Sequence, residues 1–562
     1  MSPPHRRLVA FLRRGLTWYN LALAGIIAYG LYLRLHGITW GLPFSYLNPD
    51  EGVIVREAFG IAQGNPNPGF FLYPSLFFEL VAAVYVAMAL VWHPSFAPSF
   101  LSQASLVVDP GPYLLAARLV AVAFGAASIY LVYLLGTKAF SRPVGLLAAL
   151  FLAVVPLHVT YSHYAVTDVP ATAFSLLALL LLVRAARERT LRLLTAGAFV
   201  AGVATSTKYN FGMLLVPAAV AGWYVLRPLW KREEGLRKLV RLVTRRIVAP
   251  MALGFVLFTP FAVLDPVRFA RDFYRQNEIV RQGWLGFEHA GNGYWYNVHV
   301  NLPSSLGVVL FVLCVAGLVW SLYRRRPADL VLATYAVVYY LYVSDWAALN
   351  DRYLLPIVPV LVLLAARFAV SLTRLRFVRR RLLAPAVAGL LIVAFMLPLS
   401  ASIAYDRALA GPDVRSIAKT WVETHIKPGT TVAVEPYSPP LVSRSRSSFF
   451  TAAGHQRAYY RLVRLPLPLP GARDWRHRVA FLRSRDVQYV IVSSEVYERV
   501  LAAPLVYPRQ VAFYERLAEK ARLIKRFAPG PGERGPTILI YRLTRAGALA
   551  QRHVADQPRR DG

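Results

Sequence analysis

Charged side chains of the kinds that transfer protons or bind phosphate stand beside several long apolar stretches of this sequence. Two adjacent carboxylates, Asp50 and Glu51, follow Asn48-Pro49 a short distance after the first stretch. A carboxylate at a membrane surface can act as a general base or bind a divalent cation. The first turn of a helix also favours acidic residues through the helix dipole, and proline suits the start of a helix. The spacing alone therefore leaves a functional site and a simple helix start as alternatives.

A third carboxylate, Asp168, follows a short polar and aromatic segment that begins at Tyr161 and contains His163. It precedes Pro170 at the start of another apolar stretch, so an N-cap is the alternative interpretation. A single histidine in such a segment is more often structural than a ligand. Ionisable groups near the hydrocarbon are costly, however, and each is a functional hypothesis.

Two cations lie at the ends of other apolar stretches: Lys208 in the segment 206–210 and Arg352 in the segment 350–353. A lysine can hold phosphate as a point charge, and an arginine can bind it through two parallel hydrogen bonds. The alternatives are a lysine that extends to a lipid headgroup and a weak surface pair between Arg352 and Asp351. Four separate segments thus supply carboxylates (Asp50 with Glu51, and Asp168) and cations (Lys208 and Arg352). Binding an anionic phosphate and removing a proton would require such a set.

Eleven apolar stretches position these residues. The chain has 562 residues, of which 56% are apolar and 16% charged, whereas an average soluble domain has about 25% charged residues. This composition excludes a string of soluble domains and a disordered chain, and the single cysteine, Cys314, excludes an internal disulfide. A spanning helix needs about 20 mostly apolar residues. The predicted spans are 17–35, 114–136, 143–162, 170–186, 193–207, 211–229, 247–264, 306–323, 328–344, 353–371 and 382–404.

The distribution of basic residues predicts the orientation of these spans. A net charge of +34 would suit nucleic-acid binding in a soluble protein, but the cytoplasmic loops of membrane proteins also collect Lys and Arg. With eleven spans and a cytoplasmic N-terminus, the inner segments hold 27 basic residues and the outer loops eight. This ratio predicts that a further apolar stretch, 73–92, lies at the outer interface; an ordinary span is the alternative. We therefore expect a multi-pass protein of a bacterial or archaeal plasma membrane, with no nucleic-acid partner.

The predicted fold class is a polytopic α-helical membrane protein with a small extracytoplasmic α/β domain at its C-terminus. The membrane domain covers 1–404, and within it 36–113 forms the first outer loop with juxtamembrane helices. The α/β domain covers 405–545, and 546–562 is a flexible tail.

Short apolar runs and helical patterns alternate after the last span, which is typical of a small α/β domain. The runs are 431–434, 487–492 and 537–541, and the helical patterns are 414–425 and 507–520. A second outer segment, 265–302, combines arginines with aromatic residues. It fits equally a lid over a substrate and an amphipathic helix in the membrane interface.

The order of these motifs resembles that of a known family. The segments that carry the resemblance are 49–51, 73–74, 117–136, 156–174, 205–212, 351–359, 415–441 and 489–500. They are similar to GT-C glycosyltransferases of the protein O-mannosyltransferase and lipid A aminoarabinose transferase type, glycosyltransferase family 39. The resemblance covers nearly the whole chain.

The resemblance implies an inverting transfer of a sugar from a polyprenyl-phosphate donor to an acceptor hydroxyl at the extracytoplasmic membrane surface. It implies that Asp50 is the catalytic base, with Glu51 and Asp168 as further catalytic residues. Lys208 and Arg352 would hold the donor phosphate. The substrate-binding residues that it implies are Tyr73, His163, Tyr209 and Tyr353.

The implied partners are the polyprenyl-phosphate-linked sugar, membrane lipids, and a glycan, lipid or protein acceptor. A divalent cation, Mg²⁺ or Mn²⁺, on Asp50 and Glu51 is an alternative to a site without metal. Tyr73 stands where the aminoarabinose transferases carry a lysine, which argues against lipid A as the acceptor. The alternative function is a transporter or flippase of lipid-linked sugar precursors. Few charged residues in mid-span and the lack of an obvious internal repeat favour the enzyme.

Overall fold

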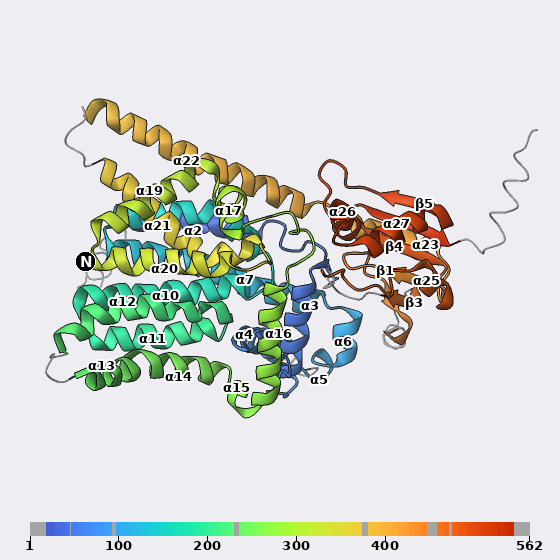
Figure 1. Cartoon of the computed structure of the whole chain (residues 1–562), viewed down its shortest axis with the longest axis horizontal. Coiled ribbons are helices and arrows are strands. Elements are labelled where there is room, and N and C mark those ends of the chain that lie inside the picture. Colours follow the sequence, from blue (N-terminus) through green and yellow to red (C-terminus); the bar gives the residue numbers. More distant parts are fainter. Residues whose placement is uncertain are drawn as a thin grey trace, which may run out of the picture.

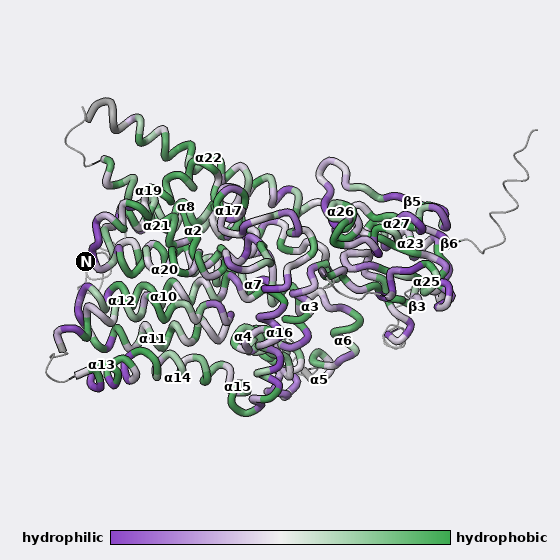
Figure 2. Tube along the Cα trace, viewed as in Figure 1, coloured by the Kyte–Doolittle hydropathy of each residue, from purple (hydrophilic) through white to green (hydrophobic). Residues whose placement is uncertain are grey.

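The chain folds into a helical bundle joined to a C-terminal α/β domain (Figure 1). The computed structural model describes residues 18–44, 47–92, 97–229, 235–373, 380–446, 458–470 and 475–543. The predicted tail at 546–562 and the basic residues of the N-terminus lie outside these ranges. In Figure 2, apolar residues dominate the bundle, whereas hydrophilic residues gather at its two ends and over the α/β domain.

The bundle is built from apolar helices that run side by side (Figure 1). Among the described residues, six helical segments are long and apolar enough to cross a membrane: α7 (Gly111–Ala139), α10 (Asp168–Glu188), η2 with α12 (Tyr209–Leu226), α20 (Pro327–Ser344), η7 with α21 (Asp351–Leu372) and Pro385–Ala410 within α22 (Arg380–Ala410). The number rises to eight if each of two bent pairs forms one span. These pairs are α8 (Arg142–Val154) with α9 (Pro156–Ser162), bent by 61°, and Gly293–Leu306 with α19 (Val308–Arg324), bent by 117°. The chain is therefore a multi-pass membrane protein.

Three further predicted spans coincide with helices that are shorter or less apolar. They are α2 (Trp18–Leu35), α11 (Leu191–Thr205) and α14 (Ala249–Phe258), none of which meets the same criterion of length and hydropathy by itself. The total of eleven spans thus stays a prediction. α11 and α14 pack closely because Gly202 and Gly254 face the opposite backbone: a Cβ on Gly202 would lie 2.0 Å from the Met251 oxygen. Small residues at such crossings are typical of helices packed within membranes.

Several helices lie across the bundle at the end that carries the α/β domain. Figure 1 shows α3 (Pro49–Ala62) and α16 (Pro266–Arg281) nearly perpendicular to α10, α11 and α12. α4 (Leu76–Trp92) is seen almost end-on in the same region, so it does not follow the axis of the bundle. The placement of 73–92 at the membrane interface stays a prediction.

The C-terminal domain contains a six-stranded sheet in the order β2-β3-β1-β4-β6-β5. The strands are β1 (Thr431–Val434), β2 (Val442–Ser443), β3 (Tyr459–Arg464), β4 (Tyr489–Ser493), β5 (Ala521–Phe527) and β6 (Ile538–Leu543). β1 pairs in parallel with β3 and β4, while β6 is antiparallel to both of its neighbours. The associated helices are α23 (Val414–His425), α25 (Val479–Ser484), α26 (Ser494–Ala502) and α27 (Pro508–Lys520).

The domain begins slightly later than predicted. α22 continues without a break to Ala410, six residues past the predicted end of the last span, and α23 follows at Val414. The helix persists because its last turns pack against the protein: Leu409 is fully buried in a cluster with Trp40 and Leu47. Hydropathy alone does not detect this extension.

Candidate active site

Asp50 lies in the first turn of α3, at the end of the bundle beneath the α/β domain. Asn48 caps this helix, since its side-chain oxygen accepts a hydrogen bond from the Asp50 amide at 3.1 Å, and Pro49 occupies the first turn. The helix-start interpretation of this motif is thus correct for Asn48 and Pro49. The Asp50 carboxylate is free of capping bonds and 27% exposed, and it lines a pocket.

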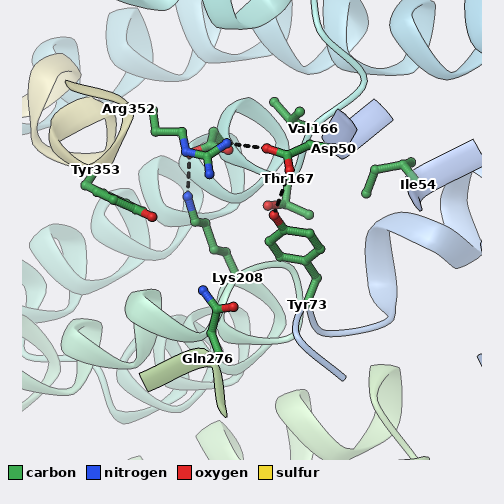
Figure 3. Close-up of a pocket in the computed structure, with 10 residues that line it drawn as sticks. Asp50, Ile54, Tyr73, Val166, Thr167, Lys208, Gln276, Arg352 and Tyr353 are labelled. Atoms are coloured by element: carbon green, nitrogen blue, oxygen red, sulfur yellow. Dashed lines mark hydrogen bonds and ion pairs between the residues drawn. The ribbon is translucent and has the colours of Figure 1, made fainter. Parts of the chain in front are cut away.

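The pocket brings together the two carboxylates and two cations that the sequence places in four separate segments (Figure 3). Arg352 Nη1 lies 2.5 Å from Asp50 Oδ2, and Lys208 Nζ lies 2.5 Å from Asp168 Oδ1. The pocket has an empty volume of about 320 Å³, which includes space open to solvent. Its lining residues are Asp50, Ile54, Tyr73, Val166, Thr167, Asp168, Lys208, Gln276, Arg352 and Tyr353.

Each charged group stands where a helix begins or ends. Asp168 is the first residue of α10, and Lys208 lies between the end of α11 and the start of η2 (Tyr209–Leu214). Arg352 belongs to η7 (Asp351–Ile357), the 3₁₀ turn that leads into α21 (Val358–Leu372). The Tyr353 ring lies 5.2 Å from Lys208 Nζ and 5.5 Å from the Arg352 guanidinium carbon. Both cations are therefore held over one aromatic face by cation–π attraction.

The neighbours of Asp50 control its protonation. Burial alone raises the pKa of this carboxyl, but the charge and hydrogen bond of Arg352, the hydroxyl of Tyr73 and the charge of Lys208 outweigh burial and lower it below its ordinary value. The Tyr73 hydroxyl donates to Asp50 Oδ1 at 3.3 Å. Burial and the Asp50 charge raise the pKa of Tyr73 well above its ordinary value, so this phenol remains a donor. Asp50 is thus ionised beside Arg352.

One donor of Arg352 is left unsatisfied in the interior. Its Nε atom is buried and has no hydrogen-bond partner within the described part of the chain. A buried unpaired donor costs free energy until a ligand or water satisfies it.

Glu51 points away from the pocket. Its side chain is completely buried and forms a two-fold ion pair with Arg118, with Nε–Oε1 at 2.7 Å and Nη2–Oε2 at 2.8 Å. Oε1 also accepts the backbone amide of Ala165 at 3.0 Å. The structure thus gives Glu51 a structural anchor in place of the predicted catalytic and metal-binding positions. The reason is helical geometry, which turns adjacent side chains by about 100°.

His163 and Tyr209, both expected at the substrate, also lie outside the pocket lining. His163 is fully buried, with its ring nitrogens 2.9 Å from the Val159 oxygen and 3.0 Å from the His36 oxygen. The Tyr209 hydroxyl donates to the Phe71 oxygen at 2.9 Å. Both residues support the walls around the site, whereas Tyr73 and Tyr353 reach the pocket as expected.

The sequence interpretation missed Gln276, a pocket residue supplied by α16. This helix arises from the segment that fitted either a lid or an interfacial helix, and it lies over the pocket. It is attached through Asp272, whose Oδ2 accepts the Phe71 amide at 3.1 Å, and through contacts of Phe269 and Phe273 with Tyr209. Figure 3 shows Gln276 beside Lys208. Gln276 follows Asp272 by four residues, so the helical period of 3.6 residues places both on one side of α16. This spacing was the sequence signal that could have identified Gln276.

Within the described ranges, no group of three or more His, Cys, Asp and Glu side chains could hold a metal ion. Asp50 and Glu51 do not form a joint site, because Arg118 and Ala165 already occupy the Glu51 oxygens. The four charged pocket groups instead pair with each other as two ion pairs.

One segment of the chain is similar to a known protein family. Residues 93–263 match the family model described as dolichyl-phosphate-mannose-protein mannosyltransferase. The matched region contains Asp168 and Lys208 but neither Asp50 nor Arg352. This segment of the chain is thus similar to that mannosyltransferase family.

Solved structures share the fold of this chain. The archaeal oligosaccharyltransferase AglB from Archaeoglobus fulgidus, in complex with an inhibitory peptide and a dolichol-phosphate, matches with a TM-score of 0.53 and 13% identity, covering 97% of this chain and 75% of that one. The apo form of the Archaeoglobus fulgidus oligosaccharyltransferase matches with a TM-score of 0.52 and 13% identity, covering 94% and 75%. ArnT from Cupriavidus metallidurans in the apo state matches with a TM-score of 0.49 and 12% identity, covering 92% and 97%. No curated protein matches the sequence.

Proposed function

We propose that this protein transfers a sugar from a polyprenyl-phosphate donor to an acceptor hydroxyl, with inversion at the anomeric carbon. The observation that carries the proposal is the convergence of Asp50, Asp168, Lys208 and Arg352 on one pocket at the end of the bundle. The AglB structure with a bound dolichol-phosphate supports a lipid-phosphate donor for this fold. The partners are this donor, membrane lipids, and a glycan, lipid or protein that offers the hydroxyl.

Lys208 and Arg352 bind the donor phosphate in this proposal. The unpaired Arg352 Nε can donate to one phosphate oxygen, and Lys208 supplies a second positive charge over Tyr353. Charge-assisted hydrogen bonds of this kind are the strong ones. They also stabilise the negative charge that grows on the phosphate as the bond between the anomeric carbon and the phosphate oxygen breaks.

Asp50 accepts the proton of the acceptor hydroxyl. The Arg352 charge keeps the Asp50 pKa low, which makes the carboxylate a weak base. A bound phosphate shares the Arg352 charge and brings a negative charge close to Asp50, and both effects raise the pKa of Asp50. The acceptor oxygen then attacks the anomeric carbon from the face opposite the phosphate, the proton passes to Asp50, and the polyprenyl phosphate leaves with the bonding electrons.

The site faces the outside of the cell in this proposal. The basic helix α13 (Gly235–Val243) lies at the end of the bundle away from α3 and α16 (Figure 1), and segments rich in Lys and Arg remain in the cytoplasm. The α/β domain, on the pocket side, is then extracytoplasmic, as expected for an enzyme that meets polyprenyl-linked sugars and envelope acceptors there.

The test uses the full-length protein in proteoliposomes with a panel of radiolabelled polyprenyl-phosphate sugars and a membrane extract as acceptor. We expect label to move from the lipid to the acceptor with at least one donor. Movement of intact lipid-linked sugar between leaflets without transfer would instead assign the alternative flippase function. The absence of both transfer and movement with every donor would overturn the proposal.

A further inference from the structure

The backbone that carries Asp50 is held by the α/β domain as well as by the bundle. Arg415, the second residue of α23, donates from Nη1 to the backbone oxygen of Leu47 at 2.7 Å. Leu47 lies three residues before Asp50. On the other side of Asp50, the adjacent Glu51 is anchored to Arg118 of the bundle. Asp50 thus lies between one anchor from the domain and one from the bundle.

Arg415 is itself held in a fixed orientation. Its Nε and Nη2 atoms bind the two oxygens of Asp413 at 2.8 and 2.7 Å, and its side chain is buried. This two-fold pair uses one side of the planar guanidinium and leaves Nη1 directed at Leu47. A lysine could not make all three bonds, because it lacks the rigid fork of arginine.

Trp40 forms a second link between the same two parts of the protein. Its ring lies between two guanidinium groups, with Arg118 of the bundle at 4.5 Å and Arg534 of the domain at 4.4 Å from the ring centre. Trp40, Leu47 and Leu409 also form one buried cluster. The arginine that anchors Glu51 is therefore in contact, through Trp40, with a residue of the domain.

The domain also docks elsewhere, independently of these contacts. Leu285, from the segment after α16, is fully buried among side chains of α26 and the chain that follows it. The Tyr507 hydroxyl donates to Glu288 Oε1 at 2.5 Å. Because this second contact lies far along the chain from Arg415, the attachment of the domain does not depend on the Leu47 anchor alone.

We infer that Arg415 is a positioning residue for Asp50, and that the α/β domain contributes to catalysis by setting the position of the catalytic carboxylate. The inference rests on the proposed function, since it assigns Arg415 to the residue proposed as base. Simple attachment of the domain would not need a buried arginine on a backbone oxygen, because an apolar contact would serve as well. Displacement of a catalytic group by about 1 Å can cost about 100-fold in rate.

The test compares the double variant Asp413→Asn/Arg415→Gln with Tyr507→Phe in the full-length enzyme. The double variant removes the Leu47 anchor and neutralises both members of the Asp413–Arg415 ion pair, and asparagine can still cap α23. Tyr507→Phe removes one hydrogen bond of the second docking contact. For each protein we would measure kcat and the KM for the donor, together with hydrogen exchange of the segment 47–62.

We expect kcat of the double variant to fall about 10- to 100-fold, with the KM for the donor within about two-fold of the wild type. The reason is that Lys208 and Arg352 lie on other segments. Amides at the start of α3 should exchange faster in the double variant only, and Tyr507→Phe should keep its kcat. An unchanged kcat, or an equal loss in Tyr507→Phe, would overturn the inference.

Hydrogen exchange separates this inference from the proposed function. If the wild type transfers no sugar from any donor, the proposed function fails, and faster exchange of α3 still shows the anchor. If the wild type is active and α3 exchanges at the same rate in all three proteins, the anchor fails while the proposed function stands.

Discussion

Replacement of Asp50 by asparagine separates the proposed base from the fold around it. The substitution keeps the shape of the side chain, and the cap from Asn48 to the Asp50 amide is a backbone contact that it does not alter. It removes the proton acceptor and the partner of Arg352 Nη1. General base catalysis contributes about 10²–10⁴-fold, so we expect kcat to fall by that factor.

The KM for the donor should not rise. Asp50 competes with the phosphate for Arg352, and asparagine carries no charge to compete. We therefore expect an equal or lower KM for the donor, which is the pattern of an interaction made in the transition state. Glu57→Gln is the matched control, because Glu57 is a carboxylate of the same helix that pairs with Arg56 outside the pocket.

The assay is transfer of labelled sugar in proteoliposomes over a range of donor concentrations, with donor binding measured separately by displacement of labelled polyprenyl phosphate. A kcat within about three-fold of the wild type in Asp50→Asn would refute the role of base. A large rise in KM with unchanged kcat would show that Asp50 serves binding instead.

Three further outcomes follow from the structure. Arg352→Ala should raise the KM for the donor well above that of Arg56→Ala, an exposed arginine outside the pocket, and an unchanged KM would contradict the phosphate contact. Glu51→Gln leaves the Arg118 charge buried without its partner, so it should destabilise the protein by about 3–5 kcal/mol. Thermal unfolding in detergent measures this loss. The double variant Glu51→Gln/Arg118→Met should recover much of the lost stability. Burial raises the pKa of Glu435 to about 7, so the folded state binds an extra proton between about pH 4.5 and 7 and loses stability as the pH rises through that window. Glu435→Gln, which mimics the protonated acid, should therefore have a free energy of unfolding higher than that of the wild type at pH 8, by an amount on the order of 3 kcal/mol. No gain is expected near pH 4.5. An equal effect on stability at both pH values would contradict this cause.

The sequence determined many of the elements and the four charged groups that meet in the pocket. Long apolar stretches can only be satisfied as helices in a membrane, since each backbone group must bond within its own segment. The structure has α23 at 414–425 and β1 at 431–434, as the local patterns predicted. Asp50, Asp168, Lys208 and Arg352 were recognisable because ionisable groups at the ends of apolar spans are costly unless they have partners.

The tertiary structure alone decided which of these groups meet and in what pairs. Asp50 and Glu51 are adjacent and chemically alike, yet one faces Arg352 in the pocket and the other faces Arg118 in the interior. Gln276 reaches the pocket only because α16 packs over it, and Arg415 reaches Leu47 only because the α/β domain docks beside α3. Local patterns determine where a helix begins, whereas the direction of each side chain depends on the packing of segments hundreds of residues apart.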